Sequence, residues 1–252
     1  MNGDSFWGFI AKGESSENAF GIFTKAHIIW LLVLALLIAV YVFFYDRGSE
    51  KRRDNMRKSM ALFLIFTEMF KQCVNSFNEV PYGLYLPLEI CSLAQYTILI
   101  DALWPSSRVS KHLLAFAFMP AAFFALLMPS AHTYSAISFY AIHQLLMHAG
   151  IVAYIIAMFK SGELRPQYRG IWISILIINI TLIPIARINA IFNTNYMFIA
   201  DPEDNPLLGF IYKAGGGSGG IPYIIGLEIL VIIVMHIMYG IYILFGDNKW
   251  RK

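Results

Sequence analysis

Apolar segments of about 20 residues, the length of α-helix that crosses a membrane, recur seven times in this sequence. A bilayer holds no water to bond backbone N–H and C=O groups, so a spanning segment is either a helix or part of a closed barrel. The alternation typical of barrel strands is absent from these segments. The sequence therefore predicts an all-α membrane protein, a seven-transmembrane helix bundle formed as a single polytopic domain over residues 1–252. The expected helices cover residues 25–45, 59–76, 83–104, 111–129, 136–159, 170–192 and 221–245.

The composition supports the membrane class. Hydrophobic residues make up 58% of the chain and charged residues 14%, whereas soluble domains contain about 45–50% and about 25%. The net charge is only +3, and the cations lie in loops beside apolar segments. We therefore expect membrane lipid, and no nucleic acid, as the partner. The two cysteines, Cys73 and Cys91, lack metal-site spacing, so no metal and no cofactor are expected. The oligomeric state is left open.

The basic residues predict how the bundle is oriented. The segment 46–58 alone holds six Lys and Arg residues. Further basic residues follow the third, fifth and seventh expected helices, namely Arg108, Lys111, Lys160, Arg165, Arg169, Lys249, Arg251 and Lys252. Because cytoplasmic loops are enriched in Lys and Arg, we expect the N-terminus outside and the C-terminus in the cytoplasm. The expected location is the cell (plasma) membrane, crossed several times.

The longest outer loop, residues 193–220, has two interpretations. It contains the acidic run "DPED" and ends in a glycine-rich stretch. Such a composition is typical of a flexible connector. It is also compatible with a lid over an outward-facing cavity.

Polar residues inside the expected helices concentrate in their outer halves. A charge within hydrocarbon costs a few kcal/mol by insertion scales, so these side chains are expected to face the bundle interior. We predict that they line an outward-opening cavity and bind substrate, and the set is Glu68, Lys71, Gln72, Glu89, Gln95, Arg187, Asn189 and Glu228. Two alternatives stay open: Glu68 and Lys71 can neutralise each other at i,i+3, and Arg187 can reach the interface by snorkelling.

A thiol and two histidines in the same outer half suggest chemistry. Cys91 and Glu89 are expected about 10–12 Å below the outer end of the third helix, at a rise of about 1.5 Å per residue. Within that helix Glu89 points about 200° away from Cys91. His143 and His148 lie in the outer part of the fifth expected helix. Cysteine with a histidine base is the minimum set for acyl transfer through a thioester.

Four runs, "FTKAHIIW", "LPLEICSL", "FYAIHQLLMHAG" and "NTNYMFIADPEDNPL", resemble the YwaF-like family of bacterial integral membrane proteins, which is related to the transmembrane protein 164 acyltransferases. The resemblance implies that Cys91, after Leu86 and Pro87, accepts the acyl group, with His148 or His143 as its base. Bacterial relatives often have a histidine where this chain has Glu89.

The leading hypothesis is a Cys/His lipid acyltransferase or acyl hydrolase that acts on membrane phospholipid through a thioester, with Cys91, His148 and His143 as catalytic residues. The alternative is a non-enzymatic protein that binds or transports a small ligand or ion in an outward-facing charged cavity. A sensor or assembly subunit without turnover is a third possibility.

Overall fold

The computed structural model describes residues 5–10, 14–203, 205–217 and 219–246, so the basic residues Lys249, Arg251 and Lys252 lie outside the described residues. Across that part of the chain the secondary structure is helical, and the β-type pairing is an isolated bridge between Ala19 and Ser135. The all-α class predicted from the sequence is thereby confirmed.

The long helices form because apolar segments begin at good N-caps. The side chains of Thr24, Ser49, Ser107 and Ser138 each accept a hydrogen bond from a backbone N–H of the first turn, which satisfies a group that the helix itself leaves free. The α-helices are α1 (Lys25–Asp46), α2 (Glu50–Phe77), α3 (Ile90–Leu103), α4 (Arg108–Leu113), α5 (Met119–Leu127), α6 (Phe139–Lys160), α7 (Arg169–Phe192), α8 (Pro206–Ala214) and α9 (Ile221–Phe245). Shorter elements are η1 (Tyr82–Leu84), the π-helix η2 (Leu114–Phe118), η3 (Ser130–Thr133) and η4 (Tyr196–Phe198).

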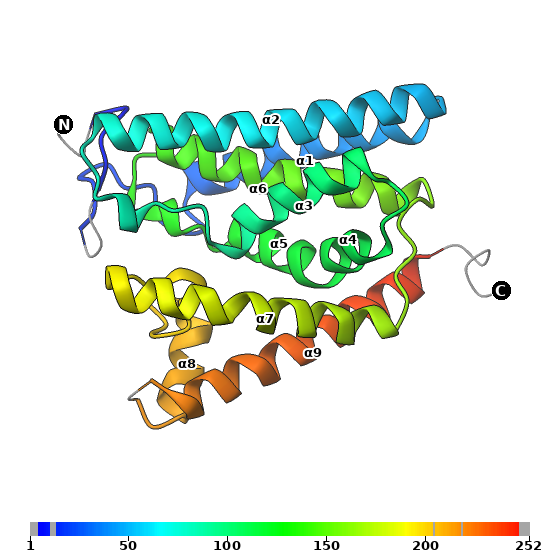
Figure 1. Cartoon of the computed structure of the whole chain (residues 1–252). Helices are drawn as coiled ribbons and strands as arrows, with labels where there is room; N and C mark the ends of the chain where they lie inside the picture. Colours follow the sequence, from blue (N-terminus) through cyan, green and yellow to red (C-terminus); the bar gives the residue numbers. More distant parts are fainter. Residues whose placement is uncertain (1–4, 11–13, 204, 218, 247–252) are drawn as a thin grey trace.

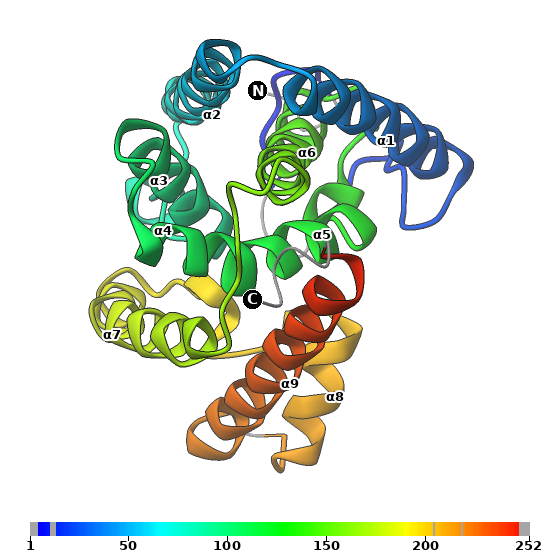
Figure 2. The same ribbon diagram turned by 90° about the vertical axis from the view of Figure 1, so that its right-hand side faces the viewer.

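Helix α6 is the centre of the bundle. It packs against α1, α2, α3 and α5, which surround it in the view along the bundle (Figure 2). The continuous unit α4–η2–α5 forms the next layer, and α7 and α9 pack on its other side. The Tyr242 hydroxyl, for example, donates to the carbonyl of Ala115 in η2 at 3.2 Å. The α4–η2–α5 unit therefore separates α7 and α9 from α6.

Five of the described helical segments are long and apolar enough to cross a membrane: Lys25–Asp46, Arg108–Thr133, Phe139–Lys160, Arg169–Phe192 and Ile221–Phe245. Two expected spans fall outside this set. Helix α2 carries charged and amide side chains in its apolar part, and α3 has 14 residues. The structure therefore agrees with the predicted class, a membrane protein of several helices. Its described part contains five segments that meet these criteria, two fewer than the seven spans predicted from the sequence.

The third expected helix starts later than predicted, at Ile90 instead of residue 83. Pro87 explains the delay, because the residue before a proline is disfavoured in the α conformation. Glu89 is consequently the N-cap residue of α3. The predicted depth of Glu89 and Cys91, and the angle of about 200° between them, assumed a continuous helix from residue 83 and are wrong for this reason.

Candidate functional site

A group of polar side chains, here called the Glu68 cluster, lies between α2, α3 and α6. It consists of Glu68, Lys71 and Gln72 from α2, Gln95 from α3 and His143 from α6. The Lys71 Nζ lies 2.8 Å from Glu68 Oε1, and Gln72 Nε2 donates to the same oxygen at 2.7 Å. Gln95 Nε2 reaches Glu68 Oε2 at 3.5 Å. The spacing i, i+3, i+4 placed the three α2 residues on one face; in the structure Glu68 is buried, and Lys71 and Gln72 are half-buried.

Helix α6 brings His143 to this cluster. Both Glu68 and Lys71 are close enough to interact electrostatically with the imidazole. The Nε2 atom of His143 and the Oε1 atom of Gln95 are buried, and neither has a hydrogen-bond partner. Buried polar atoms are nearly always paired in native proteins. Two unpaired atoms in one cluster therefore mark it as a candidate for binding a polar group.

His148, five residues further along α6, is buried and held in one tautomer. Its Nδ1 lies 2.7 Å from the carbonyl oxygen of Gln144. Because a carbonyl only accepts, Nδ1 carries the proton, and Nε2 of a neutral ring keeps its lone pair. This is the tautomer that a general base needs.

Cys91 lies in the first turn of α3, where its side chain is 7% exposed and part of the main apolar core. Gln95 follows four residues later, so Cys91 shares a helix face with a member of the Glu68 cluster. Glu89 is close enough to interact electrostatically with the thiol. Within the described residues no hydrogen bond joins Cys91 to His143 or His148.

The beginning of the outer loop is fastened over the start of α3. The Tyr196 hydroxyl donates to the carbonyl of Gly83 at 2.6 Å and accepts from the Leu86 N–H at 2.8 Å. The carboxylate of Glu89 accepts from the Met197 N–H at 3.1 Å. Burial raises the pKa of Tyr196 to about 12, so its hydroxyl is protonated at neutral pH and can donate. Residues next to Cys91 are thus held by the loop.

Asn189, at the end of α7, holds the same loop from the other side. Its Oδ1 accepts from the Tyr196 N–H and from the Thr194 hydroxyl, both at 2.9 Å, and its Nδ2 donates to the Tyr196 carbonyl at 3.1 Å. Further along, the loop contains α8, which packs against α9. The segment 193–220 is therefore structured over much of its described length.

Replacing Tyr196 by phenylalanine is expected to loosen this fastening. The variant loses two hydrogen bonds and leaves the Gly83 carbonyl and the Leu86 N–H without their partner, a local cost of about 1–3 kcal/mol. Hydrogen exchange in residues 82–89 and 193–199 should accelerate about 5–100-fold, since about 1.4 kcal/mol corresponds to tenfold.

Tyr212→Phe is the matched control, because the Tyr212 ring packs on Tyr223 and its hydroxyl makes no hydrogen bond within the described residues. Unchanged exchange at residues 82–89 in Tyr196→Phe would contradict the proposed fastening.

The structure places Arg187 and Glu228 away from the Glu68 cluster. Arg187 is exposed and Glu228 half-buried, and no hydrogen bond or ion pair in the described part of the chain joins either to the cluster. Helices α7 and α9 meet near Tyr168 and His236, whose side chains are 3.2 Å apart, and diverge toward the other end (Figure 1). The α4–η2–α5 unit lies between these helices and α6.

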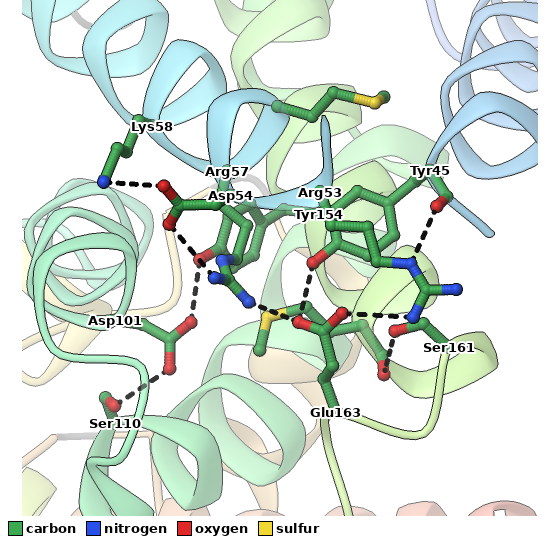
Figure 3. Close-up of polar contacts among 12 residues, drawn as sticks. Tyr45, Arg53, Asp54, Arg57, Lys58, Asp101, Ser110, Tyr154, Ser161 and Glu163 are labelled. Carbon is green, nitrogen blue, oxygen red and sulfur yellow. Dashed lines mark hydrogen bonds and ion pairs between the residues drawn. The ribbon is translucent and has the colours of Figure 1, made fainter. Parts of the chain in front are cut away.

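A second polar network, at the opposite end of α2, α3 and α6, was missed by the sequence analysis (Figure 3). Glu163 accepts from Arg57 and, at 2.8 Å, from the Tyr45 hydroxyl, and its other oxygen lies 3.5 Å from Arg53. Arg57 also lies 3.2 Å from Asp54.

The same network extends to α3 through the electrostatic interaction of Arg57 with Asp101. The fully buried carboxylate of Asp101 accepts from the Tyr154 hydroxyl at 2.7 Å and from the Ser110 hydroxyl at 3.2 Å. A sequence feature that could have indicated this network is Asp101, a charged residue inside the third apolar segment. Arg57 was interpreted as one of the loop charges of segment 46–58, Glu163 was not singled out, and only the fold brings them together.

Apolar helices that enclose buried charged clusters define this chain as a polytopic α-helical membrane protein. The chain belongs to the TMEM164 family, whose model matches residues 22–239. No curated protein and no solved structure matches the chain. The relation to transmembrane protein 164 that the sequence runs indicated is therefore confirmed.

Proposed function

We propose that this protein is a lipid acyltransferase or acyl hydrolase that acts on membrane phospholipid through a thioester on Cys91. One observation carries the proposal: Cys91 lies in the first turn of α3, one turn before Gln95, which contacts Glu68 in the buried polar cluster. A thiol attacks only after it loses its proton, so the mechanism requires a base. The YwaF-like resemblance assigns the acyl-accepting role to Cys91.

The proposed reaction has two halves. Nε2 of His148, or alternatively of His143, removes the thiol proton of Cys91, and the sulfur attacks the carbonyl carbon of a phospholipid ester. The C–S bond forms, the ester C–O bond breaks, and the proton passes to the departing oxygen of the lysolipid. Water or another lysolipid hydroxyl then attacks the thioester, releasing the acyl group and returning the proton to sulfur.

The imidazole must reach the sulfur when substrate is bound. Hydrogen bonds between catalytic groups are often formed only in the substrate complex. His148 is favoured as the base because its Nδ1 proton is held by the Gln144 carbonyl. Glu68, Lys71, Gln72, Gln95 and His143 are proposed to bind the polar part of the substrate. The unpaired Nε2 of His143 and Oε1 of Gln95 support that role, and Glu89 is proposed to position the first turn of α3.

We further propose that the chain crosses the plasma membrane seven times, with its N-terminus outside the cell and its C-terminus in the cytoplasm. The chain begins α1 and ends α9 at opposite ends of the bundle (Figure 1), which supports an odd number of crossings. The two crossings beyond the five apolar segments would be α2 and α3, whose buried polar residues include Glu68, Gln95 and Asp101. Membership of the YwaF-like bacterial branch is proposed on the same sequence runs.

The alternative is a protein that binds or transports a small polar ligand or ion without turnover. The two unpaired buried atoms of the Glu68 cluster favour it, because they could receive a ligand without any role for the thiol. In this case Glu68→Gln would abolish ligand-induced stabilisation, and Cys91→Ala would not.

Trapping the acyl-enzyme tests the proposal. The purified protein is reconstituted in vesicles of phosphatidylcholine with an isotopically labelled acyl chain, quenched in acid and analysed by intact mass. We expect an acyl adduct, removable by hydroxylamine, in the wild type and in Cys73→Ser, whose exposed thiol is the matched control. Cys91→Ser should form no hydroxylamine-sensitive adduct. An equal thioester adduct in Cys91→Ser, or an adduct confined to Cys73, would refute the mechanism.

A further inference from the structure

A groove runs between α1 and α2 at the basic end of the bundle. Its volume is about 330 Å³, and it is lined by Tyr41 of α1 and by one face of α2 that includes Arg52, Asn55, Ser59, Met60 and Phe63. Met56 also lines the groove; the cationic Arg52 is the first lining residue along α2, and the apolar Met60 and Phe63 are the last. At about 1.5 Å per residue, Arg52 and Phe63 are about 16 Å apart along the helix axis. The groove thus runs from a cationic mouth to an apolar interior.

Arg52, like Arg47 and Lys51, has no carboxylate partner in the described part of the chain, and of these three residues only Arg52 lines the groove. Arg53 and Arg57 pair with Glu163, and Lys58 pairs with Asp54 at 2.7 Å. The hydrogen bond from Lys58 holds the pKa of Asp54 below its ordinary value. The guanidinium of Arg52 instead lies over the Phe44 ring, 5.2 Å from its centroid. This cation is therefore available to an anion from outside the protein.

The order of these groups matches one class of molecule. In a bilayer the charged head group of a phospholipid lies at the interface, and its acyl chains extend toward the midplane. Basic segments beside membrane helices attract the anionic head groups of the adjacent leaflet. The amide of Asn55 and the hydroxyl of Ser59, one and two turns after Arg52, can donate to phosphate oxygens on the same helix face.

We propose that the α1–α2 groove binds one anionic phospholipid of the leaflet at the basic end of the bundle. Its phosphate contacts Arg52, with Asn55 and Ser59 as further donors, and one acyl chain lies along Met60 and Phe63. Arg52 precedes Glu68 by about 24 Å of helix. The site is therefore separate from the proposed acyl-transfer site, and its failure would leave that proposal untouched.

Nanodiscs of defined lipid test the site. The full chain is placed in phosphatidylcholine discs with and without phosphatidylglycerol, and the melting temperature and the lipids retained in native mass spectra are measured. Phosphatidylglycerol is expected to raise the melting temperature of the wild type by about 2–4 °C, the shift for one additional charge contact in a chain of this size. Arg52→Gln should lose most of that shift and bind the lipid about fivefold more weakly.

Two variants separate the groove from general charge attraction. Lys51→Gln removes the same charge from an exposed neighbouring residue that does not line the groove, and it should keep the shift. Ser59→Trp fills the groove without changing charge, and it should lose the shift. Equal losses in Arg52→Gln and Lys51→Gln would overturn the proposal. An equal shift from inorganic phosphate in pure phosphatidylcholine discs would overturn the lipid assignment.

Discussion

Cys91→Ala is expected to lower lipid acyl turnover by about 10⁴- to 10⁶-fold, the range observed when a covalent nucleophile is removed. The physical reason is that alanine cannot form the thioester, so both halves of the reaction disappear together. The assay measures release or transfer of a labelled acyl chain in reconstituted vesicles. Cys91 is buried, so each variant's melting temperature is measured alongside to show that it is folded.

Substitutions of His143 and His148 test which histidine is the general base in the same mechanism. Removing a general base costs about 10²- to 10⁴-fold, so the imidazole that serves as base should give the larger loss of the two. The tautomer of His148, with its proton on Nδ1, favours this residue. Cys73→Ala, which removes an exposed thiol from α2, should turn over at the wild-type rate. Undiminished turnover in Cys91→Ala would exclude the thioester and leave ligand binding by the Glu68 cluster as the better account.

Glu163→Gln is expected to destabilise the protein by about 2–3 kcal/mol. The change keeps the shape of the side chain but removes the charge that faces Arg57 and Arg53. Removing one partner of a fully buried pair costs about 3–5 kcal/mol. The Glu163 side chain is 21% exposed and the Arg57 side chain 10%, so solvent screening reduces the effect. Equilibrium or thermal unfolding in detergent micelles measures it.

Lys58→Gln is the matched control for this prediction. Lys58 pairs with Asp54 at the same end of α2, but its side chain is 49% exposed. Exposed pairs contribute about 0–1 kcal/mol, so the control should unfold close to the wild type. If both variants lost the same small amount of stability, the network in Figure 3 would behave as a solvated surface cluster. It would then contribute little to the packing of α1, α2 and α6 against one another.

Local sequence patterns were sufficient for several features of the site. The spacing of Glu68, Lys71 and Gln72 predicted a shared helix face, and these side chains do contact one another. Gln95, predicted to join them from the next helix, lies within 3.5 Å of Glu68. These predictions succeed because helix periodicity and the cost of exposing charge to lipid are properties of the segment itself.

The sequence alone determined the helical class, the approximate helix positions and the burial of the α2 polar face, since each depends on hydrophobicity and spacing along a short stretch of chain. Only the tertiary structure decided which distant groups meet. It placed the α4–η2–α5 unit between α6 and the helices that carry Arg187 and Glu228, and it brought Glu163 to Arg57 and Tyr45. Contacts of this kind depend on how whole helices pack, and no local pattern encodes the neighbour that a helix face will find.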